Sequence, residues 1–297
     1  MVLTAGCRNA PIELAGGGVA DADERDGRVV VASFNFGESR LVAEIYARAL
    51  ENAGVPVRRE VNLGPRELVA AALLQGHVDV VPEYLGTAAA ALGAGTSGSR
   101  VAADALDGLR SALEPYGLRA LAPAPAEDQN AVVVRRTVAE ELGLASVSDL
   151  APHARSLTLG GPPECPLRRY CGRGLDDVYG LTFAEFVPLD GADRTRRALV
   201  EDVIDVGIMF TTDPYLAARD LVALADDRHL QPPENIVPIA RSAVLDQYDE
   251  ATAALDQISM RLTTTALRLL NWRVSVAGHD PRREAEGWLI RQGLLPR

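Results

Sequence analysis

The stretch from Val29 to Thr87 most constrains the fold of this chain, because short apolar runs alternate in it with segments of helical period. Three strands and two helices are predicted in alternation: strand 28–34, helix 41–50, strand 55–63, a helix from Pro65 that Gly76 closes, and strand 78–81. Strands that alternate with helices indicate a parallel sheet joined by right-handed crossovers. This part of the chain therefore predicts an α/β fold.

Aromatic residues stand where two of these strands end. Ligands of open α/β sheets bind beyond the carboxyl ends of the strands, so Phe34 and Tyr84 are expected at one binding edge. The alternative is that Phe34, Phe36 and Tyr84 are ordinary core residues. Three aromatic residues at strand ends favour a site.

Collinear motifs along the chain resemble one family of proteins. The motifs are SFNFGES, EIYARALENAG, NLGPRE, VPEYLGTA, LAPAPAEDQNAVVV, SDLAPHARSLTLGGPPECP, LDDVYGLTF, FTTDPYL, ENIVPIARSAVLDQY and ISMRLTTTALRLLN. In order and spacing they are similar to the osmoprotectant-type substrate-binding proteins of ABC importers, which capture glycine betaine, choline and related quaternary amines. The resemblance spans about Val29 to Leu295.

The resemblance implies a two-lobed type II periplasmic-binding-protein fold. Its two parallel-type sheets would be flanked by helices, with a ligand cleft between the lobes. The expected parts are a leader and tether over 1–27, a first lobe of 28–126 plus 235–297, and a second lobe of 127–234. The crossings around 123–129 and 230–235 carry proline and polar residues, so we expect the hinges there.

The same resemblance implies a receptor and not an enzyme. The receptor is expected to be a monomer outside the cytoplasm that binds a small solute, needs no cofactor and delivers the solute to a membrane permease. The histidines are scattered and no nucleophile, metalloprotease or phosphate-loop motif is present, so the residues offer no catalytic constellation. The net charge of -11 argues against a nucleic-acid partner, because phosphate binding needs a basic face.

The binding residues come from the family pattern. Tyr84 and Phe210 fall at aromatic-cage positions, Thr87 is the polar neighbour of Tyr84, and Arg168 or Arg169 fits a carboxylate clamp, although both arginines could instead be a solvated loop pair. The candidate ligand-binding residues are Phe34, Asn35, Tyr84, Thr87, Gln129, Asn130, Arg168, Arg169, Phe210, Thr211 and Glu234.

Two departures from the family pattern leave the solute open. Asn130 and Glu234 stand where the family has aromatic rings, and Phe34 replaces a common lysine. Glu234 could supply a negative partner to a cation beside a reduced aromatic box. Alternatively, Gln129, Asn130 and their polar neighbours suit a polyol, a sugar-like solute or an amine, because buried polar groups need partners.

The segment around Pro214 predicts a helix and its cap. Pro214 can begin a helix, and Asp213 with the hydroxyl groups of Thr211 and Thr212 is expected to cap it.

The three cysteines fall into two groups. Cys165 and Cys171 flank PLRRY in a loop rich in glycine and proline, so we expect a disulfide in an oxidising compartment. Two thiolates alone leave zinc short of ligands, and the spacing is not that of a redox motif, so neither a metal site nor redox catalysis is expected.

Cys7 follows Leu3-Thr4-Ala5-Gly6, which resembles the end of a bacterial lipoprotein signal. We expect lipid on Cys7 and a cell-surface anchor, although the preceding tract is shorter than the apolar core of a secretory signal. A chance cysteine in a disordered leader is the alternative.

Overall fold

The computed structural model describes residues 27–94, 101–189, 191–217 and 220–296, so Cys7 and the expected leader lie outside the described residues. The chain divides into two compact units. The first unit holds the chain up to Pro123 together with Val237–Gln257, and the second holds Ala124–Ile236 and Ile258–Arg297.

The first unit is built on a five-stranded sheet. Its strands lie in the order β2 (Val57–Gly64), β1 (Val29–Phe34), β3 (Val80–Tyr84), β10 (Ile236–Arg241) and β4 (Leu118–Ala120). β1 runs parallel to β2 and β3, whereas β4 pairs antiparallel with β10. All six residues of β1 are buried, as a central strand of a doubly covered sheet requires.

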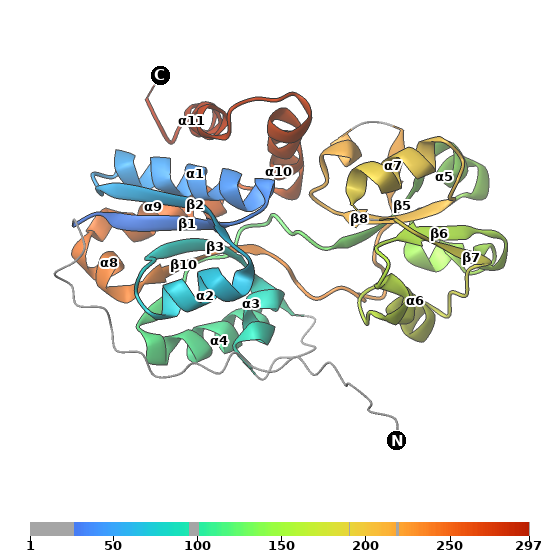
Figure 1. Cartoon of the computed structure of the whole chain (residues 1–297), viewed down its shortest axis with the longest axis horizontal. Coiled ribbons are helices and arrows are strands. Elements are labelled where there is room, and N and C mark those ends of the chain that lie inside the picture. The colour runs from blue at the N-terminus through green and yellow to red at the C-terminus, as the bar shows by residue number, and fades with distance from the viewer. Residues whose placement is uncertain (1–26, 95–100, 190, 218–219, 297) are drawn as a thin grey trace. The chain divides into compact units, whose positions relative to one another are not determined.

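Helices cover both faces of this sheet. They are α1 (Gly37–Asn52), α2 (Arg66–Leu74), α3 (Leu85–Ala91), α4 (Ala102–Leu113), α8 (Ser242–Gln247) and α9 (Asp249–Ser259). The crossover from β1 to β2 runs in the opposite direction to that from β2 to β3, so two right-handed connections place α1 and α2 on opposite faces (Figure 1). The apolar stripe of α1, with Leu41, Ile45 and Leu50 fully buried, packs on the sheet.

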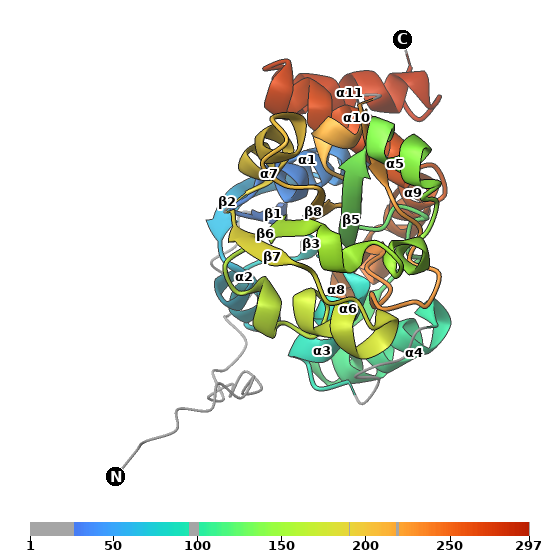
Figure 2. The same ribbon diagram turned by 90° about the vertical axis from the view of Figure 1, so that its right-hand side faces the viewer.

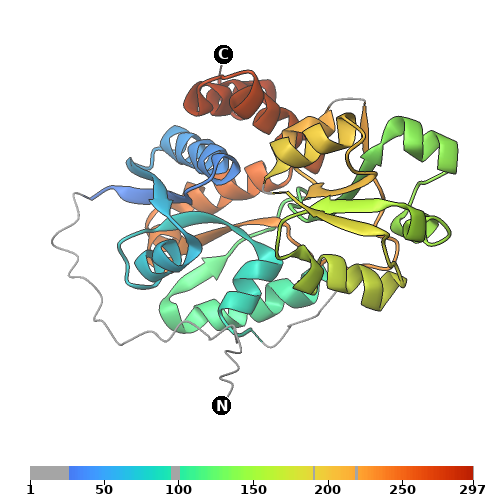
Figure 3. The same cartoon turned by 45° about the vertical axis from the view of Figure 1, so that its right-hand side comes forward.

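The second unit repeats the plan. Its strands lie in the order β7 (Glu185–Pro188), β6 (Thr158–Gly161), β8 (Val206–Phe210), β5 (Asn130–Arg135) and β9 (Leu221–Ala223). The first four are labelled in Figure 2. β6 runs parallel to β7 and β8, and β5 runs antiparallel to β8 and β9. The helices are α5 (Arg136–Leu142), α6 (Gly172–Tyr179), α7 (Ala192–Val200), α10 (Thr264–Asn271) and α11 (Pro281–Arg291), and Figure 3 shows α6 and α7 on opposite faces of the sheet.

Alternation along β5 divides the core of the second unit in two. Val132 and Val134 belong to one apolar cluster, and Ala131 and Val133 belong to the other. Because successive side chains of a strand point to opposite faces, Asn130 lies on the face of Val132 and Val134. This is also the face of the cluster that contains Cys165 and Cys171.

The C-terminal part of the chain differs from the expected first lobe. Residues 258–297 associate with the second unit, where Arg268 of α10 donates two hydrogen bonds to the carbonyl oxygen of Thr211, at 3.1 and 2.7 Å. Asn271 Nδ2 donates to the carbonyl oxygen of Thr212 at 3.0 Å. These polar contacts of α10 could not be seen in its apolar pattern.

The segments that were expected as hinges pair with each other. Ala124 N–H donates to Ile236 O at 2.8 Å, Ile236 N–H to Ala126 O at 2.9 Å, and Asp128 N–H to Glu234 O at 3.0 Å. The two connections therefore run antiparallel, side by side, through backbone hydrogen bonds.

Candidate functional site

The first unit carries an aromatic cluster, which consists of Phe34, Phe36 and Tyr84. The rings of Phe34 and Phe36 stack with centroids 5.8 Å apart, and those of Phe36 and Tyr84 are 5.9 Å apart. Phe34 at the end of β1 is 1% exposed and Tyr84 at the end of β3 is 5% exposed, whereas Phe36 is 42% exposed. The ring that the cluster offers to solvent is therefore Phe36, which directly precedes α1.

Opposite charges lie beside the aromatic cluster. The hydroxyl group of Tyr84 donates to Glu38 Oε1 at 2.9 Å. The guanidinium carbon of Arg66 lies 4.7 Å from the centroid of the Phe34 ring, and Arg66 forms an ion pair with Glu83. The cluster thus has a half-buried carboxylate at Tyr84 and a protein cation over Phe34.

Glu83 is a buried carboxylate that depends on Arg66. Burial raises the pKa of Glu83 above its ordinary value, while the charge and hydrogen bond of Arg66 and the backbone N–H of Tyr84 oppose that shift. Arg66 is the first residue of α2 and Glu83 lies in β3, so the pair ties the helix to the sheet.

Two further candidates of the first unit are exposed. Asn35 donates its backbone N–H to Gly64 O at 3.0 Å, and both its side chain and that of Thr87 lie on the surface. Asn35 directly follows β1, and Thr87 lies in the first turn of α3, which begins after Tyr84 of the aromatic cluster.

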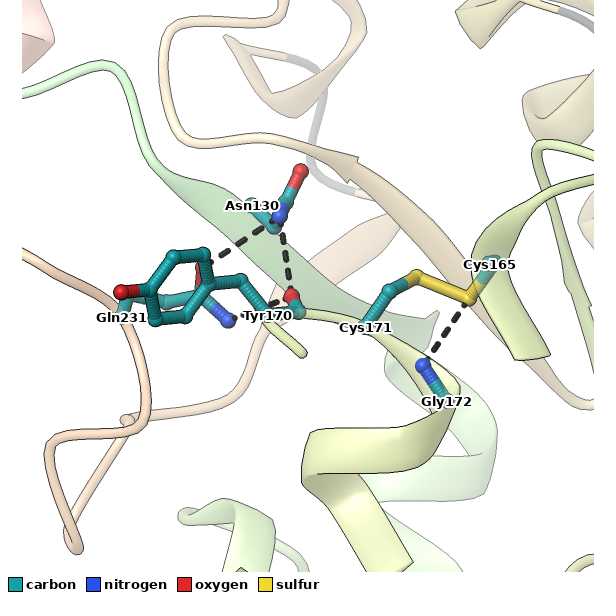
Figure 4. The surroundings of a disulfide bond; sticks show 6 residues. All are labelled: Asn130, Cys165, Tyr170, Cys171, Gly172 and Gln231. Carbon is teal, nitrogen blue, oxygen red and sulfur yellow. Dashed lines mark hydrogen bonds between the residues drawn. A yellow bond between two sulfur atoms is a disulfide. The ribbon is translucent and has the colours of Figure 1, made fainter. Parts of the chain in front are cut away.

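In the second unit, Asn130 and Phe210 face each other across neighbouring strands. They are register partners at the ends of β5 and β8, so their side chains lie next to each other on one face of the sheet. Phe210 is 50% exposed and Asn130 is half-buried. Asn130 Nδ2 donates to Tyr170 O at 2.9 Å and to Gln231 Oε1 at 3.3 Å (Figure 4).

Gln129 and Thr211 are brought together but are largely occupied. Gln129 N–H donates to Thr211 Oγ1 at 3.0 Å, and Gln129 Nε2 donates to Pro232 O at 2.8 Å. The hydroxyl group of Thr211 donates to Glu127 O. Thr211 therefore fixes the start of β5 instead of capping a helix.

The expected cap at Pro214 is made by Asp213 alone. Asp213 Oδ1 accepts from Tyr215 N–H at 3.0 Å and begins the short 3-10 helix η6 (Pro214–Ala217). The hydroxyl group of Thr212 donates to Asp128 Oδ1 at 2.8 Å.

A disulfide closes the loop that carries Arg168 and Arg169. Figure 4 shows the bond between Cys165 and Cys171, whose sulfur atoms are 1.99 Å apart. Both arginines are exposed, and the guanidinium carbon of Arg169 lies 5.6 Å from the centroid of the Tyr170 ring. The structure therefore leaves both cations at the surface of the second unit.

Of the acidic residues near the paired connections, Glu234 is buried and Glu127 is half-buried. Glu234 is 8% exposed and its backbone carbonyl oxygen accepts from Asp128 N–H. Burial raises the pKa of Glu127, and a hydrogen bond with Asn235 opposes this. Together with Gln129 and Asn130 they make this part of the second unit rich in oxygen acceptors.

The sequence pattern did not single out Arg66, Tyr170 or Gln231. It placed Phe36 with Phe34 and Tyr84 among the aromatic residues that favour a site, but not among the candidate ligand-binding residues. The exposure of Phe36 had a signal, since it falls between the end of a strand and the start of a helix. The other three act through a backbone carbonyl oxygen or an ion pair between distant segments, which no local pattern reveals.

Among the described residues, no group of three or more histidine, cysteine, aspartate or glutamate side chains is arranged to hold a metal ion. Within the same ranges, no helix has the length and apolar character that crossing a membrane requires.

Comparison with known proteins gives concordant matches. A family model described as the substrate binding domain of ABC-type glycine betaine transport system matches residues 27–291. The glycine betaine-binding protein YehZ of Escherichia coli K12 is 28% identical over 269 residues, which cover 86% of this chain and 88% of that protein. A glycine-betaine-binding protein of Pseudomonas aeruginosa is 29% identical over 278 residues, covering 88% and 86%.

A solved structure supports the fold. The structure of apo YehZ from Escherichia coli superposes with a TM-score of 0.80 at 26% identity and covers 90% of this chain and 99% of that one. The expected fold class, with five-stranded sheets flanked by helices as in type II periplasmic binding proteins, is therefore confirmed.

Proposed function

Because this chain belongs to the family of substrate-binding domains of ABC-type glycine betaine transport systems, we propose that it captures a small quaternary amine outside the plasma membrane and delivers it to a cognate permease. A binding domain of a transporter is not an enzyme, in agreement with the expectation from the sequence. The side chains near the ends of the strands in each unit indicate which kind of solute is bound.

The observation that carries this proposal is the exposed ring of Phe36 in the aromatic cluster. A quaternary ammonium group has no hydrogen to donate, so it is recognised by aromatic faces and negative charge. Phe36 offers the ring and Glu38, which accepts from Tyr84, offers the charge. In the second unit the half-exposed ring of Phe210 is the corresponding candidate.

Calorimetric titration with choline and with its uncharged isostere tests this proposal. In the isostere, carbon replaces the quaternary nitrogen, so shape is retained and charge is removed. Cation–π contacts contribute about 2 kcal/mol or more when desolvated, so we expect choline to bind at least about tenfold more tightly. Equal affinity for the two compounds would refute recognition of the cation.

A more polar solute is the second candidate function. It is favoured by Asn130 and Glu234, which stand at positions expected to be aromatic and bring oxygen acceptors to the second unit. Binding of a polyol, with no binding of glycine betaine, choline or carnitine in the same titration, would support this candidate.

The finer parts of the assignment are proposals as well. We propose a monomer, lipid on Cys7, and Arg168 or Arg169 as the partner of an anionic group of the solute. Mass spectrometry of the protein from its native membrane tests the lipid, and an unmodified Cys7 would overturn it. The exposed position of both arginines allows substitution of each by alanine without disturbing the fold.

A further inference from the structure

The backbone carbonyl oxygen of Tyr170 sets the orientation of two side-chain amides. It accepts from Asn130 Nδ2 at 2.9 Å and from Gln231 Nε2 at 3.0 Å (Figure 4). A carbonyl oxygen can only accept, so both amides must turn their nitrogen atoms toward it. The opposite orientation of Asn130 would place two acceptors against each other.

The second hydrogen of the Asn130 amide is also used. Asn130 Nδ2 donates it to Gln231 Oε1 at 3.3 Å. Both donors of Asn130 are thus satisfied inside the second unit, and within the described ranges no donor reaches its oxygen. Figure 4 shows this oxygen pointing away from Tyr170 and Gln231. Asn130 therefore presents an acceptor and no donor.

The two groups that orient Asn130 are held firmly. Tyr170 lies in the loop that the disulfide closes, and the N–H of Gly172 donates to Cys165 Sγ at 3.2 Å. Gln231 is held from the other side, because its backbone N–H donates to Asp226 Oδ2 at 2.8 Å. The acceptor is therefore set before any solute arrives.

The position of this acceptor gives it a role in selectivity. Asn130 is the register partner of Phe210, so its side chain is the neighbour of a half-exposed ring on the same face of the sheet. A solute whose ammonium group meets the ring would bring its other end within reach of the oxygen. A hydroxyl group there can donate to Asn130, whereas a carboxylate would meet another acceptor.

We propose that Asn130 is a specificity-determining residue that favours quaternary amines with a hydroxyl donor over those with a carboxylate. The inference rests on the proposed function, since it concerns which quaternary amine is bound. Gln231 acts as a positioning residue, because it occupies the donor that Asn130 could otherwise offer to a carboxylate.

The experiment is a titration of the full chain with choline and glycine betaine, which differ in that group. Wild-type protein should bind choline about tenfold more tightly, the equivalent of one hydrogen bond to the solute. Asn130→Ala should weaken choline binding about tenfold and leave glycine betaine nearly unchanged. Gln231→Leu should lower the preference for choline, because the Asn130 amide loses one of the two hydrogen bonds that orient it.

The matched control is Gln247→Leu, which deletes an exposed amide of α8 in the first unit and should leave the affinity ratio unchanged. Orientation is read separately by NMR, where slow exchange of the Asn130 amide protons in wild type should become fast in Gln231→Leu. A preference for glycine betaine, or a ratio that neither variant changes, overturns the inference alone. Absence of binding of any quaternary amine overturns the proposed function and the inference with it.

Discussion

At the scale of the residue, the pair of Arg66 and Glu83 makes the sharpest prediction of stability. Glu83 is 6% exposed, so removal of its partner leaves a buried carboxylate without its cation. We expect Arg66→Met to cost about 3 kcal/mol of unfolding free energy at neutral pH. Chemical denaturation measures the loss, and Arg66→Met combined with Glu83→Gln should recover much of it.

The pH dependence of that loss has a definite sign. The pKa of Glu83 is raised by burial in the native protein, so its contribution to stability is complete below the unfolded pKa and is lost as the pH rises through the folded pKa. Without Arg66 that pKa rises further. The variant should therefore lose less stability near about pH 5 than at neutral pH, and an equal loss at both would contradict this account.

The binding residues show what could be read from the sequence at this scale. The aromatic positions at the strand ends were predictable, because periodicity locates the ends of β1 and β3. The exposure of Phe36 also had a sequence signal, since this residue lies between the strand that ends at Phe34 and the helix that follows. The amide orientation of Asn130 depends on Tyr170 and Gln231, which are distant in sequence.

At the scale of the element, α11 offers a clean test of helix capping. Asp280 accepts from Arg283 N–H at 3.0 Å and Pro281 occupies the first turn. Asp280→Ala should cost about 1 kcal/mol, because one N–H of the first turn loses its acceptor. Thermal or chemical unfolding measures this, and Asp280→Asn, which keeps a side-chain oxygen, should cost much less. Equal losses in both variants would argue against the cap.

The first turn of α6 lies too close to the disulfide loop for a side chain. A Cβ atom added at Gly174 would come 2.0 Å from the carbonyl oxygen of Arg169. We expect Gly174→Ala to cost about 3 kcal/mol, since backbone of the loop or of the helix must move. At Gly180, at the other end of α6, an added Cβ atom has no neighbour within 4 Å, and only the φ of +68° is unfavourable for a side chain. Gly180→Ala should therefore cost about 1 kcal/mol. Similar losses at both positions would contradict close packing of the loop.

Elements with strong periodicity were predictable and elements without it were not. The strands and helices expected between residues 28 and 81 are present with shifted ends. The edge strands β4 and β9 have three residues each, too few for alternation to be recognised. The C-terminal part of the chain forms the separate helices α9 and α10, and a π-helical turn at Trp272–Val276 follows α10.

At the scale of the whole molecule, the α/β class follows from the alternation of strands and helices, while the assignment of 258–297 does not. Arg268 and Asn271 of this segment hydrogen-bond to the backbone after β8. Side-chain contacts to a distant carbonyl oxygen leave no periodic signal. The resemblance to the family predicted two lobes, but the pattern of neighbouring residues could not predict where the chain passes from one unit to the other.

The last prediction concerns both units. Phe36 and Phe210 are about half-exposed rings of different units, so each substitution by alanine should change the unliganded stability little, and the two effects should add within about 0.5 kcal/mol. Choline at a hundredfold excess over its dissociation constant should stabilise the wild type by about 2.7 kcal/mol. Phe36→Ala and Phe210→Ala, each tested by itself, should weaken choline about tenfold and lower the ligand-induced shift in melting temperature. Leu68→Ala, at an exposed apolar residue of α2, is the control. A full shift in either ring variant would mean that its unit contributes no ring to the bound solute.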